Sequence, residues 1–112
     1  MKRVRPRLSR ALLLEVAHRV RDRLLPDRDA EGGDCQPVAE ALERALRRRG
    51  FGAGCRLGNW RGHPHMWVVV ENWSIDPTRD QFRYYVEEEE DALLDAPVLV
   101  WRGAHPEYGS AW

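Results

Sequence analysis

The sequence predicts an α+β fold in which helices come first and a small antiparallel sheet follows. Up to Gly50, apolar residues recur at helical spacing in two segments. Beyond Gly50 they form short runs rich in Val and Trp, separated by Gly, Asn and Pro, which is typical of strands and turns. The chain has 112 residues, 43% of them hydrophobic, enough for one core of two packed layers. We therefore expect a single domain over residues 1–112.

The first helix is predicted from Ser9 to the stop at Pro26. Ser is a favoured N-cap residue, and apolar side chains follow it at spacings of three and four. These are Leu13, Val16, Ala17, Val20 and Leu24. Residues 1–8 are basic, contain Pro6 and are expected to fray. Residues 27–33 form a polar loop before the second helix.

The second helix is predicted over residues 35–49 and ends at Gly50, as a C-terminal glycine should. Its apolar face carries Val38, Ala39, Leu42 and Leu46 together with Cys35. Pro37 fits only in the first turn, where the backbone N–H groups have no intrahelical partner. The start of the helix is therefore fixed at residue 34 or 35, and Cys35 lies at its N-terminus.

Four strands are predicted after Gly50, over residues 51–57, 65–71, 73–76 and 97–101. Turns are expected at residues 59–64 and 71–72. Residues 84–94 are ambiguous between helix and strand. The acidic run 87–91 should be exposed to solvent and is best interpreted as a short helix.

Charge and cysteine content restrict the class of protein. The net charge is zero, but residues 1–28 hold nine Lys or Arg against three Asp or Glu. No aromatic residue is interleaved with these basic residues, so nucleic-acid binding is not predicted. The apolar stretch 11–14 is too short for a membrane span or a signal peptide. Two cysteines in a chain of this length indicate free thiols in the cytoplasm, with a secreted effector or toxin domain as the alternative.

Cys35, His65 and Asp76 are the residue types that thiol catalysis requires, and each stands at the end of a predicted element. A helix N-terminus lowers the pKa of a thiol through its dipole and free N–H groups. An imidazole can exchange a proton with the thiol, and a carboxylate can hold the imidazole in the useful tautomer. His65 shares one strand face with Trp67 and Val69, at the edge of the predicted core. No cofactor is needed for this chemistry.

Each of these residues also has an ordinary structural interpretation, since buried Cys is often inert and Asp before Pro often starts a turn. Their combination, in this order and at element ends, favours a catalytic site. Cys55 lies within an apolar strand and is expected to be structural. Asp80 lies beyond the Asp-Pro-Thr turn and is expected to be exposed.

Three segments resemble transglutaminase-like proteins. GDC, ending at Cys35, with the helix end LRRRG before a strand, is similar to their Gly-x-Cys segment and the Leu-Arg-x-x-Gly that follows it. HMWVVV, starting at His65, resembles their His-Ala-Trp-Val-Glu-Val strand. WSIDPT, which contains Asp76, resembles their Trp-x-x-Ile-Asp-Pro-Thr strand. The similarity spans residues 32–78 with Gln81 and Phe82.

The resemblance implies a papain-like fold, with a nucleophile-bearing helix packed on a small antiparallel sheet. The superfamily includes transglutaminases, peptide N-glycanase-like proteins, peptidases and bacterial papain-fold toxins. Carried over by position, Cys35 is the nucleophile, His65 the general base and acid, and Asp76 the orienting carboxylate. The spacings, 30 residues from Cys35 to His65 and 11 from His65 to Asp76, imply a core with short loops.

The chain departs from the family upstream of Cys35, where papain-like enzymes usually carry a Gln, Asn or Trp that stabilises the oxyanion. Residues 1–34 contain none of these. The backbone N–H of Cys35, with a side chain of Gln36, Asn59 or Trp60, is the expected substitute. Two further residues near His65, His63 and Trp67, are candidates for contacts with substrate.

The function expected from these residues is cysteine-dependent acyl transfer or hydrolysis at an amide, such as a Gln side chain or a peptide bond. Short loops favour a protein or peptide substrate, in a cleft formed by residues 59–64 and the segment after Thr78. One alternative is a catalytically inactive binding module of the same fold. Another is a zinc site formed by Cys35, His63, His65 and Asp76, although these lack a paired Cys-x-x-Cys.

Overall fold

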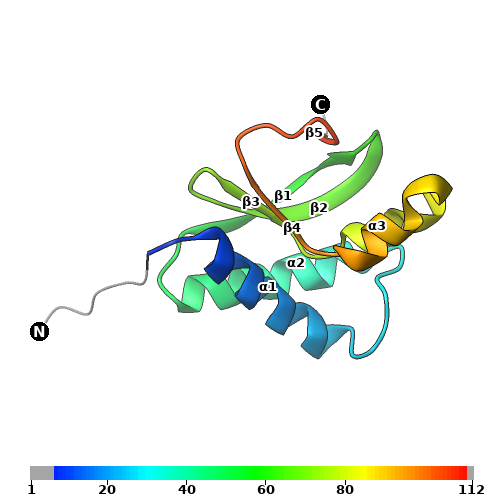
Figure 1. The fold of residues 1–112 in the computed structure, drawn as a ribbon. Helices are drawn as coiled ribbons and strands as arrows, with labels where there is room; N and C mark the ends of the chain where they lie inside the picture. The colour runs from blue at the N-terminus through cyan, green and yellow to red at the C-terminus, as the bar shows by residue number, and fades with distance from the viewer. Residues whose placement is uncertain (1–6, 111–112) are drawn as a thin grey trace, which may run out of the picture.

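The computed structural model describes residues 7–110, and in these residues two long helices cover one face of a five-stranded antiparallel sheet (Figure 1). The strand order is β4-β3-β2-β1-β5. The predicted α+β class, with helices before an antiparallel sheet, is confirmed. The expectation that residues 1–8 fray falls for residues 1–6 outside the described part of the chain.

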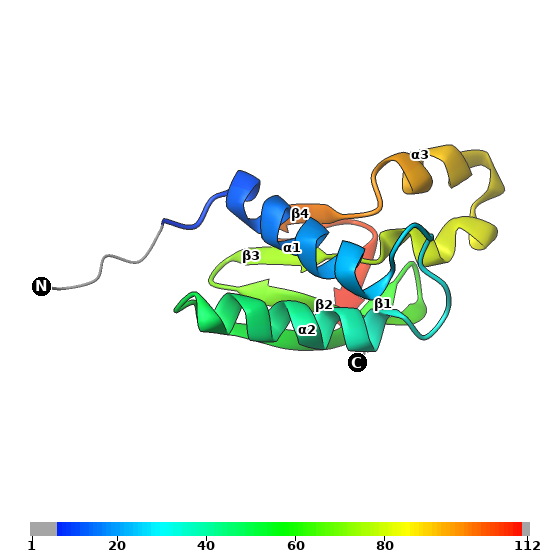
Figure 2. The ribbon, with the colours of Figure 1, turned by 90° about the horizontal axis from the view of Figure 1, so that it is seen from below.

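The two long helices begin where the sequence predicts. Helix α1 (Arg10–Leu24) is capped by Ser9, whose hydroxyl accepts a hydrogen bond from the backbone N–H of Leu12 at 3.1 Å. Helix α2 (Cys35–Arg48) is followed by Gly50 at a positive φ of 90°, a backbone conformation that glycine adopts at little cost. Figure 2, which looks at the molecule from below, shows α1 and α2 next to each other in front of the strands.

The main core lies between these helices and the sheet. Its members are apolar side chains that have lost nearly all contact with solvent, and each contributes about 1.5–3 kcal/mol to the free energy of unfolding. Among them are Leu13 and Val16 from α1, Leu42 and Leu46 from α2, and Val68, Val70 and Ile75 from the sheet.

Strands β1 (Ala53–Trp60) and β2 (His63–Val70) form a tight hairpin, which corrects the predicted loop at residues 59–64. The turn consists of Arg61 and Gly62 alone, with φ values of 47° and 86°. Two consecutive positive φ angles match the right-handed twist of a hairpin, so pairing continues to the turn. The loop that we expected to line a cleft is therefore part of the sheet.

The remaining strands are β3 (Trp73–Asp76), β4 (Leu99–Arg102) and β5 (Tyr108–Ser110). The turn at residues 71–72 and strand β3 agree with prediction, whereas β4 begins two residues later than expected. Strand β5 was not predicted, because three residues are too few for a periodic pattern. It pairs with β1, so that Tyr108 lies opposite Trp60.

The segment between β3 and β4 is helical. It contains two 3₁₀ helices, η1 (Arg79–Tyr85) and η2 (Glu87–Glu89), and then α3 (Glu90–Asp95). The predicted short helix at residues 87–91 is thus correct in type, although its first turn is 3₁₀ and the helix extends further. Phe82 and Leu93 pack with Trp60 in a second, smaller core. Among the described helices, none is long and apolar enough to cross a membrane.

Candidate active site

His65 and Asp76 meet on the sheet face that α1 and α2 do not cover. Side chains alternate along β2, so Val68 and Val70 enter the main core and His65 points to the opposite face. On the neighbouring strand β3, Ile75 enters the core and Asp76 points the other way. The Nε2 atom of His65 lies 2.8 Å from Oδ2 of Asp76, and both side chains are inaccessible to solvent. The hydrogen bond expected between these two residues is present.

Cys35 reaches this pair from the first residue of α2 and is half-buried. Burial raises the pKa of its thiol, but interactions with the His65 ring and the Met66 backbone outweigh burial and leave the pKa below its ordinary value. Since Nε2 of His65 is bonded to Asp76, Nδ1 is the ring nitrogen that remains for the thiol. Nδ1 is buried and makes no well-aligned hydrogen bond, and the Cys35 thiol is among the groups that act on the His65 ring.

The charges of the site support one another. Burial lowers the pKa of His65, but the Asp76 carboxylate and the Cys35 thiol more than reverse this effect and raise the pKa to about 9. Burial likewise raises the pKa of Asp76, whereas hydrogen bonds from His65, Tyr108 and the Thr78 backbone hold the pKa below its ordinary value. The arrangement therefore favours an imidazolium between a carboxylate and an ionisable thiol.

Tyr108 is a member of the site that sequence reasoning missed. Its hydroxyl donates a hydrogen bond of 2.5 Å to Oδ2 of Asp76, the same oxygen that His65 contacts. The contact joins residues 32 positions apart and exists only because β5 adds to the edge of β1. No local pattern around Tyr108 signals it.

Cys55 has an environment that disfavours its thiolate form. Its backbone N–H donates to the Glu43 carboxylate at 2.7 Å, and its side chain is half-buried. Burial and the nearby Glu43 charge raise the pKa of the Cys55 thiol to about 12. The raised pKa agrees with the structural role expected for Cys55. The Glu43 carboxylate contributes to this pKa in addition to burial in the strand.

The three candidate oxyanion side chains make other contacts. Gln36 is exposed and donates to Glu40 at 3.1 Å. The Oδ1 atom of Asn59 accepts from the Gly62 backbone at 3.2 Å, within the hairpin turn. Trp60 is completely buried and stacks on Phe82, with ring centroids 4.5 Å apart. Gln36 and Asn59 are thus held by contacts within α2 and the hairpin, whereas Trp60 packs on η1 and its buried Nε1 has no hydrogen-bond partner among residues 7–110. The backbone N–H groups at the start of α2 are the donors closest in sequence to the thiol.

His63 and Trp67 flank His65 without sharing its role. His63 packs against Tyr85, with ring centroids 4.3 Å apart. Trp67 is buried beside Tyr108 and packs so closely on Gly58 that a Cβ there would overlap its ring. Trp67 thus packs next to the His65 ring on the outer sheet face.

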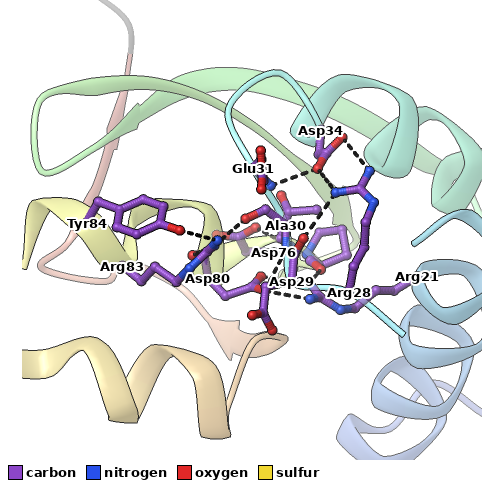
Figure 3. A network of polar contacts seen from close by, with 12 residues as sticks. Arg21, Arg28, Asp29, Ala30, Glu31, Asp34, Asp76, Asp80, Arg83 and Tyr84 are labelled. Atoms are coloured by element: carbon purple, nitrogen blue, oxygen red, sulfur yellow. Dashed lines mark hydrogen bonds and ion pairs between the residues drawn. The ribbon is translucent and has the colours of Figure 1, made fainter. Parts of the chain in front are cut away.

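Asp80 is fully buried, and the expectation that it is exposed is wrong (Figure 3). Its carboxylate forms a two-pronged ion pair with Arg21 of α1, at 2.7 and 2.6 Å. It also accepts the backbone N–H of Ala30, in the loop before Cys35, at 2.8 Å. A sequence signal existed, because Arg21 lies one helical turn after Ala17 on the buried face of α1 and a buried Arg requires a partner.

Two arginines extend this contact into a clamp of Arg21, Asp80 and Arg83. Arg83 donates to the carbonyls of Ala30 and Asp80, and Arg21 donates to the Pro77 carbonyl at 2.8 Å. The clamp therefore joins the loop that leads into Cys35 to the segment that follows Asp76. It fixes the two parts of the chain that must meet at the site.

Asp34 immediately precedes Cys35 but its side chain does not cap α2. Its carboxylate is instead held by Arg28, at 2.9 and 3.2 Å, and by the Glu31 backbone N–H at 2.7 Å (Figure 3). The first N–H groups of α2 are thus not occupied by this side chain.

Two further features bear on ligands. Within residues 7–110, no cluster of three or more His, Cys, Asp or Glu is arranged to hold a metal ion, so the zinc alternative gains no support. A hollow of about 530 Å³ lies on the outer sheet face, lined by residues that include Trp67, Trp101 and Tyr108 but not Cys35. The hollow therefore lies next to Tyr108, which contacts Asp76, and not next to the Cys35 thiol.

Comparisons of the chain with family models, with curated proteins and with solved structures find no match.

Proposed function

We propose that this protein is a cysteine-dependent enzyme of the papain-like, transglutaminase-related class, acting on an amide of a protein or peptide. The observation that carries the proposal is the connection from Asp76 through His65 to the Cys35 thiol at a helix N-terminus. The depressed pKa of Cys35, beside a second cysteine whose pKa is raised, adds support. The α+β fold, with the nucleophile helix packed on an antiparallel sheet, is compatible with that class.

In the first half of the reaction, the Cys35 thiolate attacks the amide carbonyl and forms a C–S bond, which produces a tetrahedral oxyanion. When this intermediate collapses, the C–N bond breaks and the His65 imidazolium gives its proton to the leaving nitrogen. The leaving group is ammonia from a Gln side chain or an amine from a peptide bond. A thioester on Cys35 and a neutral His65 remain.

In the second half, His65 accepts a proton from the incoming nucleophile as it attacks the thioester. Water gives a carboxylate and completes deamidation or proteolysis, whereas an amine gives a new amide. The Cys35 C–S bond breaks, the thiolate returns and His65 is again an imidazolium. Asp76 keeps the ring oriented throughout and stabilises its positive charge.

The N-terminus of α2 supplies the oxyanion donors in this proposal. The backbone N–H groups of Cys35 and Gln36 belong to the first turn and have no intrahelical acceptor. Because Arg28 and the Glu31 backbone hold the Asp34 carboxylate, that negative charge does not occupy the helix terminus. Free N–H groups at this position stabilise an oxyanion.

The proposal is tested with a peptide probe in which the amide of one glutamine side chain is replaced by a chloromethyl ketone. Trypsin cleavage after Arg28, Arg44 and Arg56 places Cys35 and Cys55 in separate peptides, so mass spectrometry identifies the labelled thiol. We expect labelling at Cys35, none at Cys55, and much faster reaction than with chloroacetamide.

Two variants serve as controls. Cys35→Ala should abolish labelling, and Cys55→Ala should leave its rate unchanged. Equal labelling of both cysteines, or no advantage of the peptide probe over chloroacetamide, would contradict the proposed function.

A further inference from the structure

Asp76 carries an interaction that a Cys-His-Asp site does not require. Its Oδ2 oxygen accepts two hydrogen bonds, from Nε2 of His65 at 2.8 Å and from the Tyr108 hydroxyl at 2.5 Å. Its other oxygen, Oδ1, accepts the Thr78 backbone N–H at 3.0 Å. The carboxylate is fully buried, so these three donors replace its water.

Two donors on one oxygen compete for the same negative charge. A hydrogen bond to a carboxylate stabilises the charged form and makes the oxygen a weaker proton acceptor. The hydroxyl of Tyr108 therefore weakens the hydrogen bond that Asp76 accepts from the His65 N–H. A weaker hydrogen bond makes the imidazolium less stable, and the thiolate of Cys35 depends on that imidazolium.

The position of Tyr108 is held independently of the site. Its ring packs on Trp101, with centroids 4.2 Å apart, and edge-on against Trp67 at 5.3 Å. Burial next to Asp76 raises the pKa of the Tyr108 hydroxyl far above its ordinary value, so the hydroxyl stays protonated and can only donate to the carboxylate. The donor is thus preorganised by the aromatic residues of the outer face.

We propose that Tyr108 is a positioning residue that weakens Asp76 as a partner of His65, and thereby sets the pH at which Cys35 becomes a thiolate. This inference rests on the proposed function. The other titratable groups that face Tyr108 are Arg79, His105 and Glu107, and the other groups that face His65 are those of the site itself. Among the described residues, His65 and Tyr108 are the two side chains that donate hydrogen bonds to Asp76.

The test is the pH dependence of Cys35 alkylation by iodoacetamide, measured by mass spectrometry in matched variants. Removal of the hydroxyl in Tyr108→Phe should move the midpoint to lower pH, by about half a unit, because part of a charge-assisted hydrogen bond is transmitted through Asp76. Asp76→Asn should move the midpoint in the opposite direction, to higher pH. Tyr85→Phe, an exposed tyrosine, is the control and should change nothing.

A second measurement does not depend on the folding of Tyr108→Phe. The chain has three tyrosines, so 3-fluorotyrosine incorporated into a Tyr84→Phe/Tyr85→Phe variant enters position 108 alone. Fluorination makes the phenol a stronger donor. The midpoint should therefore rise relative to the same variant without fluorine, opposite in sign to Tyr108→Phe.

Opposite shifts on weakening and strengthening the donor support the inference, because a purely structural contact would not produce them. No shift with fluorotyrosine, or a shift of Tyr108→Phe in the direction of Asp76→Asn, overturns it while leaving the proposed function in place. If Asp76→Asn does not move the midpoint, the proposed function and this inference both fail.

Discussion

At the scale of single residues, His65 determines how the site responds to pH. Its pKa in the folded protein is about 9, above the ordinary value of 6.5. The imidazolium contributes stability that is fully present below pH 6.5 and is lost as the pH rises toward 9. We expect the free energy of unfolding to fall between pH 6 and pH 9 by an amount on the order of 3 kcal/mol from this residue.

Urea unfolding at several pH values in this window checks the prediction. His65→Gln should lower the stability at pH 6 and show a much shallower decrease toward pH 9. Parallel pH profiles of the wild-type protein and the His65→Gln variant would show that folding does not raise the pKa of His65.

At this scale the predicted positions agree with the structure where a residue has a local signature. Pro37 marks the helix start at Cys35, and Pro77 marks the end of the strand at Asp76. Tyr108 could not be identified, because its contact depends on a long-range strand pairing that has no local pattern. Asp80 was misjudged since its partner, Arg21, is 59 residues away in α1.

At the scale of elements, the clamp of Arg21, Asp80 and Arg83 joins α1, the loop before Cys35 and η1. We predict that Asp80→Asn lowers the free energy of unfolding by about 3–5 kcal/mol, because it leaves the buried Arg21 guanidinium without its counter-charge. The double variant Arg21→Met/Asp80→Leu should recover part of this loss, since no unpaired charge remains buried.

The matched control is Glu15→Gln, which removes the exposed ion pair of Glu15 with Arg19 on the same helix. Such pairs contribute about 0–1 kcal/mol, so this variant should unfold almost as the wild type does. Urea denaturation measures all three variants. If Asp80→Asn is no more destabilising than Glu15→Gln, the clamp does not hold these elements together.

The hairpin of β1 and β2 shows why element boundaries were harder to predict than element types. Gly, Asn and Pro at residues 58–64 suggested a loop, but the backbone needs only Arg61 and Gly62 for the turn. Asn59 and Pro64 lie opposite each other in the ladder. The turn preference of Asn59 and Pro64 was overridden by strand pairing, because each residue has a partner on the opposite strand.

At the scale of the whole molecule, the fold brings together four elements that lie between residues 35 and 110. Helix α2 contributes the thiol at its N-terminus, β2 and β3 contribute the imidazole and carboxylate on the outer sheet face, and β5 covers the carboxylate. The class of fold and the order of its main elements followed from periodicity together with helix-capping, Pro and Gly residues. The contacts of η1 and β5 with the outer face did not, because both are short segments without a periodic pattern.

In the proposed mechanism Cys35 owes its reactivity to His65, and His63 is the internal control. Both imidazoles lie on one face of β2, yet only His65 contacts Asp76 and interacts with the thiol, whereas His63 packs on Tyr85. The decisive measurement is the pH dependence of Cys35 alkylation by iodoacetamide in wild type, His65→Ala and His63→Ala. We predict that His65→Ala moves the midpoint toward that of an ordinary thiol and that His63→Ala leaves it unchanged. A midpoint that moves in His63→Ala and stays in place in His65→Ala would contradict this mechanism.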